Sequence, residues 1–155
     1  MNISESIKIV AAIAPQVGAA ITGDYISLKK AGHVTVLVDI TQGHADVVSI
    51  TIEQATKVDG TGSKAIAKAV PIYLVADAAV SDEWVAQTPA VAYTTSAALK
   101  HKLVAFEINA SDLDVAGGFD CITVKTAASN AANITQASYI LSALRYGIGA
   151  SVIVD

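Results

Sequence analysis

The sequence is poor in charged residues. Asp, Glu, Lys and Arg make up 15% of its 155 residues, against about 25% in an average soluble protein. Hydrophobic residues reach 53%, and the mean hydropathy is +0.52. A chain with so few charged residues has few side chains suited to a solvent-exposed surface. This favours an assembly in which neighbouring subunits cover part of the surface. Ala and Val richness without any partner gives the same composition and stays an alternative.

Positively charged residues are fewer than negatively charged ones, and this scarcity argues against a nucleic-acid partner. Lys and Arg number 10 against 14 Asp and Glu, and the net charge is −4. The lysines are scattered, so the sequence has no basic patch to neutralise the phosphates of a nucleic acid. The aromatic residues are too few and too dispersed to form a stacking platform for bases or sugars. We therefore expect no nucleic-acid partner.

Cysteine is nearly absent, which rules out an internal disulfide bond. The single Cys121 lies in the strand-like run F-D-C-I-T-V-K. A cysteine in such a run is typically a small buried residue rather than a nucleophile. A chain without disulfides also fits folding in a reducing compartment.

Long hydrophobic runs are absent as well. The apolar run at residues 9–14 follows Glu5 and ends at Pro15, so it is too short for the core of a signal peptide. The stretch 139–155 contains Arg145 and two glycines, and it is too interrupted to span a bilayer. We expect a protein made in the cytoplasm, with no membrane partner.

What the sequence does contain is a period of two. Apolar, mostly β-branched residues alternate with other residues, which is typical of antiparallel strands with one face in a core. The clearest strands are predicted at residues 34–41, 48–53, 104–109 and 121–125. Further strands are predicted at residues 25–29, 72–75, 90–95, 134–146 and 152–154.

Short turn signals separate these segments. Thr41–His44 is predicted to close a hairpin between the first two clear strands. A single helical turn is predicted at Ser81–Trp84. Many short strands spaced by Gly and Asn turns predict an all-β, single-domain protein, a sandwich or barrel. We expect an antiparallel, jelly-roll-like β-sandwich over residues 23–155.

Residues 1–22 do not follow the strand pattern. Ser4 is a candidate N-cap for a short helix over residues 4–14. The apolar residues form no clean stripe, so an extended arm fits equally well. Because the segment is apolar and is interrupted by Pro15, we expect it to reach a neighbouring subunit. The predicted contact residues are Ile3, Ile7, Ile9, Val10, Ile13 and Ile21.

The stretch V-D-G-T-G-S-K-A at residues 58–65 has the residue types of a phosphate-binding loop. A P-loop requires G-x-x-x-x-G-K-[ST] between a buried parallel strand and a helix. Here Ser63 precedes Lys64, and Pro71 cuts off the segment that follows. A dinucleotide-binding G-x-G-x-x-G fails because Ala65 stands at the last glycine position. The glycines are expected to supply positive φ angles for a surface turn, with Lys64 as a surface charge.

The stretch D-L-D-V-A-G-G-F-D at residues 112–120 partly resembles a calcium-binding loop. The EF-hand pattern fails because Ala116 and Thr123 stand at its fifth and twelfth positions. The alternatives are an Asp-rich turn that caps its own backbone N–H groups and a calcium site of another geometry.

Catalytic and metal-binding patterns are missing. His33, His44 and His101 are far apart and lack zinc-ligand spacing, and no G-x-S-x-G nucleophile motif is present. Glu83 beside Trp84 is interpreted as a loop acid next to a core or interface ring. We expect no enzymatic activity, no metal and no cofactor.

Several longer stretches resemble small structural proteins of tailed bacteriophages. They are G-D-Y-I-S-L-K-K-A-G-H-V-T-V-L-V-D-I, I-T-I-E-Q-A-T-K-V-D-G-T-G-S-K-A-I, F-E-I-N-A-S-D-L-D-V-A-G-G-F-D-C-I-T-V and A-S-Y-I-L-S-A-L-R-Y-G, all within residues 20–147. The resemblance implies a virion component made in the cytoplasm of the host bacterium. It further implies a trimeric decoration, or cement, protein that binds the major capsid protein on the capsid surface. It assigns no functional residue.

Three other functions remain open at this point. A tail or head–tail connector component belongs to the same class at a different place in the virion. A β-sandwich that binds a small ligand, such as calcium or a sugar, is a second alternative. An enzyme built on a β-barrel is the third.

Overall fold

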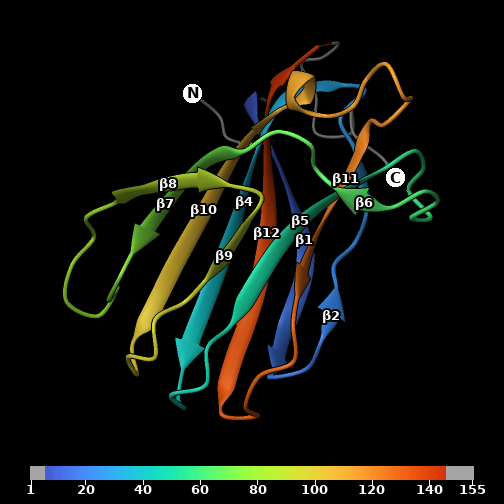
Figure 1. The fold of residues 1–155 in the computed structure, drawn as a ribbon. Coiled ribbons are helices and arrows are strands. Elements are labelled where there is room, and N and C mark those ends of the chain that lie inside the picture. Colours follow the sequence, from blue (N-terminus) through green and yellow to red (C-terminus); the bar gives the residue numbers. More distant parts are fainter. Residues whose placement is uncertain (1–5, 146–155) are drawn as a thin grey trace.

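In the computed structural model, which describes residues 6–145, the alternating segments form two antiparallel sheets packed face to face (Figure 1). In pairing order, the strands of sheet A are β1 (Lys8–Val17), β12 (Asn133–Leu144), β4 (Ala31–Gln42), β10 (His101–Asn109), β7 (Val70–Val75) and β8 (Val85–Ala90). Those of sheet B are β2 (Ile21–Thr22), β11 (Cys121–Thr126), β5 (Ser49–Ala55) and β6 (Lys64–Ala65), with β3 (Ile26–Ser27) on β11 and β9 (Ala92–Thr94) on β5. A 3-10 turn, η1 (Ala110–Asp112), follows β10. The predicted all-β antiparallel sandwich is confirmed.

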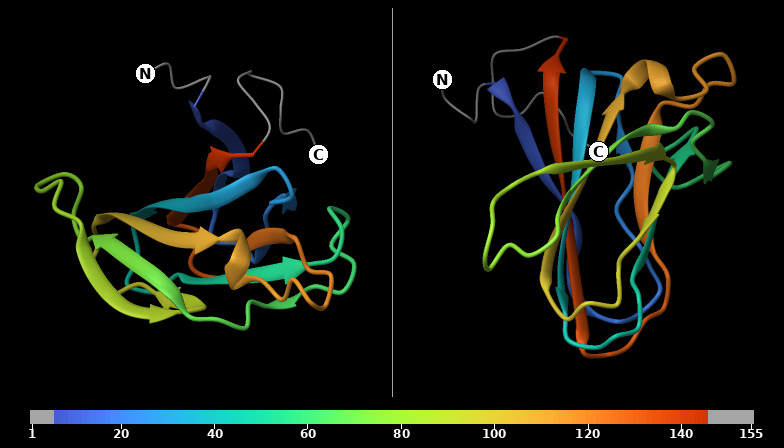
Figure 2. Two further views of the ribbon diagram at one scale, coloured as in Figure 1. Left: turned by 90° about the horizontal axis from the view of Figure 1, so that it is seen from above. Right: turned by 60° about the vertical axis from the view of Figure 1, so that its left-hand side comes forward.

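Successive groups of strands alternate between the two sheets. The chain runs from β1 in sheet A to β2 and β3 in sheet B, returns to β4, and continues in this way to β12. This connectivity is that of a jelly roll. The β7–β8 hairpin is an addition between β6 and β9, and it extends sheet A beyond β10. Figure 2 shows this hairpin protruding at one side of the sandwich.

The core lies between the sheets and is built from one face of each long strand. Its fully buried members include Val34, Val36, Val38 and Ile40 from sheet A, and Ile50, Ile52, Ile122 and Val124 from sheet B. Tyr139 ties the sheets together: its hydroxyl donates to the Asp24 carbonyl at 2.7 Å and accepts from the Val124 N–H at 3.0 Å. Burial raises the pKa of Tyr139 to about 12, so the hydroxyl keeps its proton near neutral pH.

The predicted hairpin at Thr41–His44 is wrong. The two strands that it was expected to join, β4 and β5, belong to different sheets, and β4 pairs with β10 and β12 instead. Each strand has one apolar face, and these faces meet across the core rather than along one sheet. The alternating pattern is the same in both arrangements, because it reports a buried face and not the partner of the strand.

The prediction that residues 1–22 form an arm or a short helix outside the sandwich also needs correction. Residues 8–17 are strand β1, which pairs with β12 along the edge of sheet A. The pairing register shifts twice, between Ala11 and Ile13 and between Ile13 and Gln16. Such bulges interrupt the alternation of side chains, which is why the sequence showed no strand there.

Some of the remaining strand predictions are confirmed and others are not. Those at residues 72–75, 104–109, 121–125 and 134–146 are confirmed by β7, β10, β11 and β12. Those at residues 25–29 and 90–95 shrink to the short strands β3 and β9, and β8 was missed. The expected helical turn at Ser81–Trp84 is wrong, because these residues have no helical structure and the turn lies at residues 78–80. Ser4 and the strand predicted at residues 152–154 lie outside the described residues.

Candidate interaction surfaces

Exposed apolar side chains lie in β8, in the loop before it and just before β10, and they are here called the β8 surface. Its members are Val80, Trp84, Val85 and Leu99, which are 82%, 44%, 50% and 62% exposed. Val80 and Val85 line one hollow of about 330 Å³, together with the charged side chains of Asp77, Glu83 and Lys100. An ion pair of 3.4 Å between Lys100 and Asp77 holds the base of the β8 hairpin against the start of β10.

Charge does not protect this edge against pairing with another chain. Within the described part of the molecule, β8 pairs only with β7, and most of its residues are exposed. Residues 84–99 include no Asp, Glu, Lys or Arg. Natural edge strands are normally blocked by charges, bulges or proline, and here the strand itself offers Pro89 and an irregularity in its pairing with β7. An exposed uncharged edge of this kind is typical of a surface that a partner covers.

Of the subunit contacts predicted from the sequence, Ile9, Val10 and Ile13 lie on β1, the opposite edge of sheet A. Ile7 directly precedes β1, and Ile21 lies on β2 in sheet B. Ile9 is 55% exposed, and Ile7, Val10 and Ile21 are half-buried. Ile13 packs into the core of this chain and is 5% exposed, which removes it from the set available to a neighbour. Ile3 lies outside the described residues. Contact between the exposed members and a neighbouring subunit stays a prediction.

One end of the sandwich is held together by lysine–carboxylate pairs. The pairs are Lys68–Asp112 at 2.5 Å, Lys64–Asp114 at 2.8 Å and Lys29–Asp120 at 3.0 Å. The three carboxylates of the suspected calcium loop therefore point to three different lysines. Within residues 6–145 no group of three or more His, Cys, Asp or Glu side chains is arranged to hold a metal ion.

The same loop is the predicted Asp-rich turn. Asp114 accepts a hydrogen bond from the backbone N–H of Gly117 at 2.9 Å. Burial favours the neutral form of Asp112, but hydrogen bonds from Lys68 and from the backbone and side chain of Asn109 outweigh it and lower the pKa. The loop is thus fixed by its own polar contacts, which confirms the prediction of a capped turn.

The glycine-rich stretch at residues 58–65 is a surface turn, as predicted. Gly60 and Gly62 have φ angles of +83° and +71°, which glycine adopts at little cost. The ammonium group of Lys64 is bound to Asp114 and lies 4.0 Å from the centre of the Phe119 ring. It stabilises the neighbouring loop rather than pointing into a phosphate cradle.

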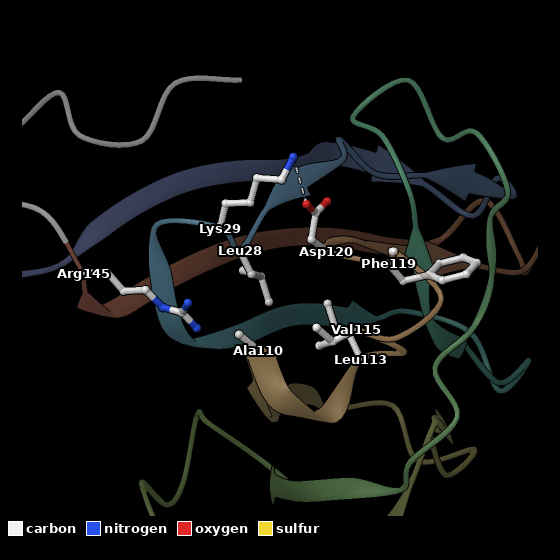
Figure 3. Close-up of a pocket in the computed structure, with 9 residues that line it drawn as sticks. Leu28, Lys29, Ala110, Leu113, Val115, Phe119, Asp120 and Arg145 are labelled. Carbon is white, nitrogen blue, oxygen red and sulfur yellow. Dashed lines mark ion pairs between the residues drawn. The ribbon is translucent and has the colours of Figure 1, made fainter.

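A hollow lies at this end of the sandwich, beside η1 (Figure 3). Its volume is about 260 Å³. Its apolar walls are formed by Leu28, Ala110, Leu113, Val115 and Phe119. Charged side chains reach its rim from Arg145 and from the Lys29–Asp120 ion pair.

The histidines and the cysteine show no catalytic arrangement. Each histidine has its own carboxylate: His33 pairs with Glu107 at 2.9 Å, His101 with Asp39 at 2.6 Å, and His44 with Asp46 at 3.4 Å. Cys121 is buried, and burial together with a hydrogen bond to Asp120 raises the pKa of its thiol to about 12. It is therefore protonated and unreactive near neutral pH, as the sequence predicted.

A buried lysine was missed in the sequence. Lys102 is 1% exposed, and its ammonium group donates to Gln42 Oε1 at 2.6 Å and to the carbonyls of Ser96 and Ala98 at 2.8 and 2.6 Å. This cluster ties the loop before β10 to the end of β4. The signal was present, because Lys102 occupies the same alternating phase as the core residues Val104 and Phe106.

The helical segments of the described chain are too short or too polar to cross a membrane. The searches that compare sequences found no matching family model and no matching curated protein. Among solved structures, the fold is similar to the crystal structure of YomS, a protein derived from the SPBc2 prophage. The TM-score is 0.51, the sequence identity is 7%, and the likeness covers 88% of this chain and 93% of that chain. At this identity the likeness concerns the fold alone: the chain is a β-sandwich of a kind that also occurs in a prophage-derived protein.

Proposed function

We propose that this chain is a structural protein of a tailed-phage particle, specifically a decoration protein that binds the shell of the major capsid protein. The observation that carries the proposal is the β8 surface, an exposed edge strand with apolar side chains and no charge in residues 84–99. The fold shared with a prophage-derived protein and the sequence resemblance to phage structural proteins support a phage origin.

The proposed mechanism is mechanical. A protein that binds only the assembled, expanded shell stabilises that state by mass action, by about 2.7 kcal/mol per site when its free concentration is 100 times the dissociation constant. Burial of apolar side chains such as Trp84 and Val85 supplies the affinity, at about 25 cal/mol per Å². Because the β8 hairpin protrudes beyond the sandwich (Figure 2), it reaches a neighbouring surface without disturbing the core. Neither catalysis nor a cofactor enters this mechanism.

The proposal includes a homotrimer on the outer surface of the capsid. The exposed apolar residues on the β1 side, Ile9, Val17 and Ile134, offer a second surface for contacts between copies. A tail or head–tail connector component is the alternative, because the same two surfaces would serve protein contacts there. A ligand-binding role is less well supported, since the acidic groups of the suspected calcium loop are engaged by lysines.

The test is binding to capsids of the phage that encodes this chain. Purified protein is incubated with expanded capsids, and the bound copies are counted by quantitative gel analysis of sedimented particles. We expect saturable binding, a trimer by native mass spectrometry, and loss of capsid binding by Val85→Lys. The control, Val47→Lys, changes another exposed valine outside the β8 surface. Binding to purified tails but not to capsids would support the alternative.

A further inference from the structure

The hollow beside η1 combines an apolar interior with an excess of positive charge at its rim. Leu28 and Leu113 form a buried floor, and Val115, which is 64% exposed, forms part of the wall. Figure 3 shows the Arg145 side chain entering from the end of β12, near Ala110, while Lys29 and Asp120 meet on another side.

The two cations at this rim differ in their partners. Lys29 is neutralised by Asp120 at 3.0 Å, and the hydrogen bond and charge of Asp120 raise the pKa of Lys29. The guanidinium of Arg145 has no hydrogen-bond or ion-pair partner among residues 6–145. Among residues 6–145, the rim therefore has one positive charge without a counter-charge, carried by the side chain best shaped for binding a carboxylate through two parallel hydrogen bonds.

The size of the hollow narrows the range of occupants. Pockets for small molecules and cofactors usually enclose about 300 to 1,000 Å³, and this hollow holds about 260 Å³. Such a space suits one or two aliphatic side chains. A carboxylate beside them would meet Arg145.

We propose that the hollow anchors an extended peptide segment of the capsid subunit in which a carboxylate adjoins aliphatic side chains. The aliphatic side chains would pack on Leu28 and Leu113, and the carboxylate would pair with Arg145. The identity of this partner rests on the proposed function, whereas the chemistry of the segment rests on the hollow. The hollow and the β8 surface would then be two separate contact points on the shell.

The first experiment uses the full-length chain and the end-blocked peptide G-V-I-V-D-G, with G-V-I-V-N-G as the uncharged control. We expect saturable, two-dimensional NMR shifts of the Leu113 and Val115 methyl groups with the acidic peptide. Arg145→Glu should weaken binding by about tenfold or more, as loss of a charge-assisted hydrogen bond does. The matched control Lys30→Glu makes the same charge change at the same end of the sandwich, outside the hollow.

Val115→Asp is a second variant, and its exposed position keeps it compatible with folding. Val115→Asp should weaken binding of the acidic peptide, as Arg145→Glu does. The proposal is overturned by equal losses in Arg145→Glu and Lys30→Glu, by equal affinity for the two peptides, or by absence of saturable binding. Residues 152–155 of this chain also read V-I-V-D, so higher peptide affinity in Asp155→Asn would assign the hollow to this chain itself and overturn the capsid partner.

The second experiment separates this proposal from the proposed function. Arg145→Glu and Lys30→Glu are compared with the wild-type chain in the capsid-binding assay. Wild-type binding that Arg145→Glu reduces about tenfold, and Lys30→Glu leaves within about twofold, supports both proposals. Wild-type binding that Arg145→Glu leaves unchanged overturns the anchor and keeps the decoration role. If the wild-type chain does not bind capsids, the decoration role fails and so does the capsid partner of the hollow.

Discussion

The two edges of sheet A differ in how they are tied to the rest of the molecule. β1 is bulged twice, and the carbonyl of its Ala12 accepts a hydrogen bond from the N–H of Asp24, at the entry to sheet B. β8 lies beyond the jelly roll proper, with Pro89 and one irregularity in its pairing with β7, most of its residues exposed and none of them charged. Bulges and coverage are the devices that keep an edge from pairing with other chains. The comparison teaches that β1 is tied to sheet B by a hydrogen bond of its own, whereas β8 is guarded by Pro89 and one pairing irregularity and has no charged residue.

The largest expected difference between the edges is in stability. Ile13→Ala in β1 removes a side chain from the core and should lower the free energy of unfolding by about 2–4 kcal/mol. Val85→Ala in β8 should change it by no more than about 0.5 kcal/mol, because the side chain is half exposed. Urea unfolding of the two variants measures both values. Equal losses would show that β8 is as firmly packed as β1, and the contrast between the edges would disappear.

A smaller effect is expected from the hydroxyl that fixes the β1 side to sheet B. Tyr139→Phe removes hydrogen bonds to the Asp24 carbonyl and the Val124 N–H. We expect a loss of about 1–3 kcal/mol, because buried polar groups are left without a partner. Urea unfolding gives the total loss. Hydrogen exchange should show faster opening of β1 than of β8, and uniform acceleration over both edges would contradict the assignment.

The loss of stability at low pH should not come from either edge strand of sheet A. β1 and β8 contain no carboxylate, whereas Asp112 is buried and its pKa is held below the usual value of 3.8 by Lys68 and Asn109. A carboxyl whose folded pKa is lowered adds stability that is present above its unfolded pKa and is lost as the pH falls through the folded pKa. Asp112→Asn should therefore flatten the fall in stability on acidification below about pH 4. An unchanged slope in urea unfolding at several pH values would exclude this carboxyl as its source.

Much of the fold was predictable because period two reports a buried face. Val34, Val36 and Val38 identified β4 in this way, and the sandwich followed. The same pattern does not reveal which strand lies beside which, so the crossover from β4 to β5 was mistaken for a hairpin. Strand β1 was hidden by its two bulges, and β8 by a sequence, V-A-Q-T-P-A, with no alternation.

The candidate site was less predictable than the fold. The sequence showed that residues 84–99 are uncharged, but only the arrangement of the sheets places Trp84 and Val85 on a free edge. Arg145 belongs to the rim of the hollow because β12 ends beside η1, and no local motif marks it. Lys102 alone had a clear signal, a lysine in the core-facing phase of a strand.

Single charges placed on the two edge strands should hardly change the stability of the free protein, but one of them should strongly reduce capsid binding. Val85→Lys and Val17→Lys each add one charge at an exposed position of an edge strand, and both should leave the free energy of unfolding within about 0.5 kcal/mol. Because Val17 lies on the proposed surface between copies, the two variants are compared at equal trimer concentration, set by native mass spectrometry. Under that condition only Val85→Lys should abolish capsid binding in the sedimentation assay. If Val17→Lys abolishes it and Val85→Lys does not, the capsid contacts the β1 edge.

Hydrogen exchange of the free and capsid-bound protein tests the central claim most directly. If β8 is the edge that the shell covers, the backbone amides of residues 85–88 and of Ala90 should exchange about tenfold or more slowly in the bound state. The amides of residues 8–17 should be protected to the same degree in both states, with the protein in its assembled form throughout. Protection gained by β1, with β8 exchanging at its free rate, would contradict the account.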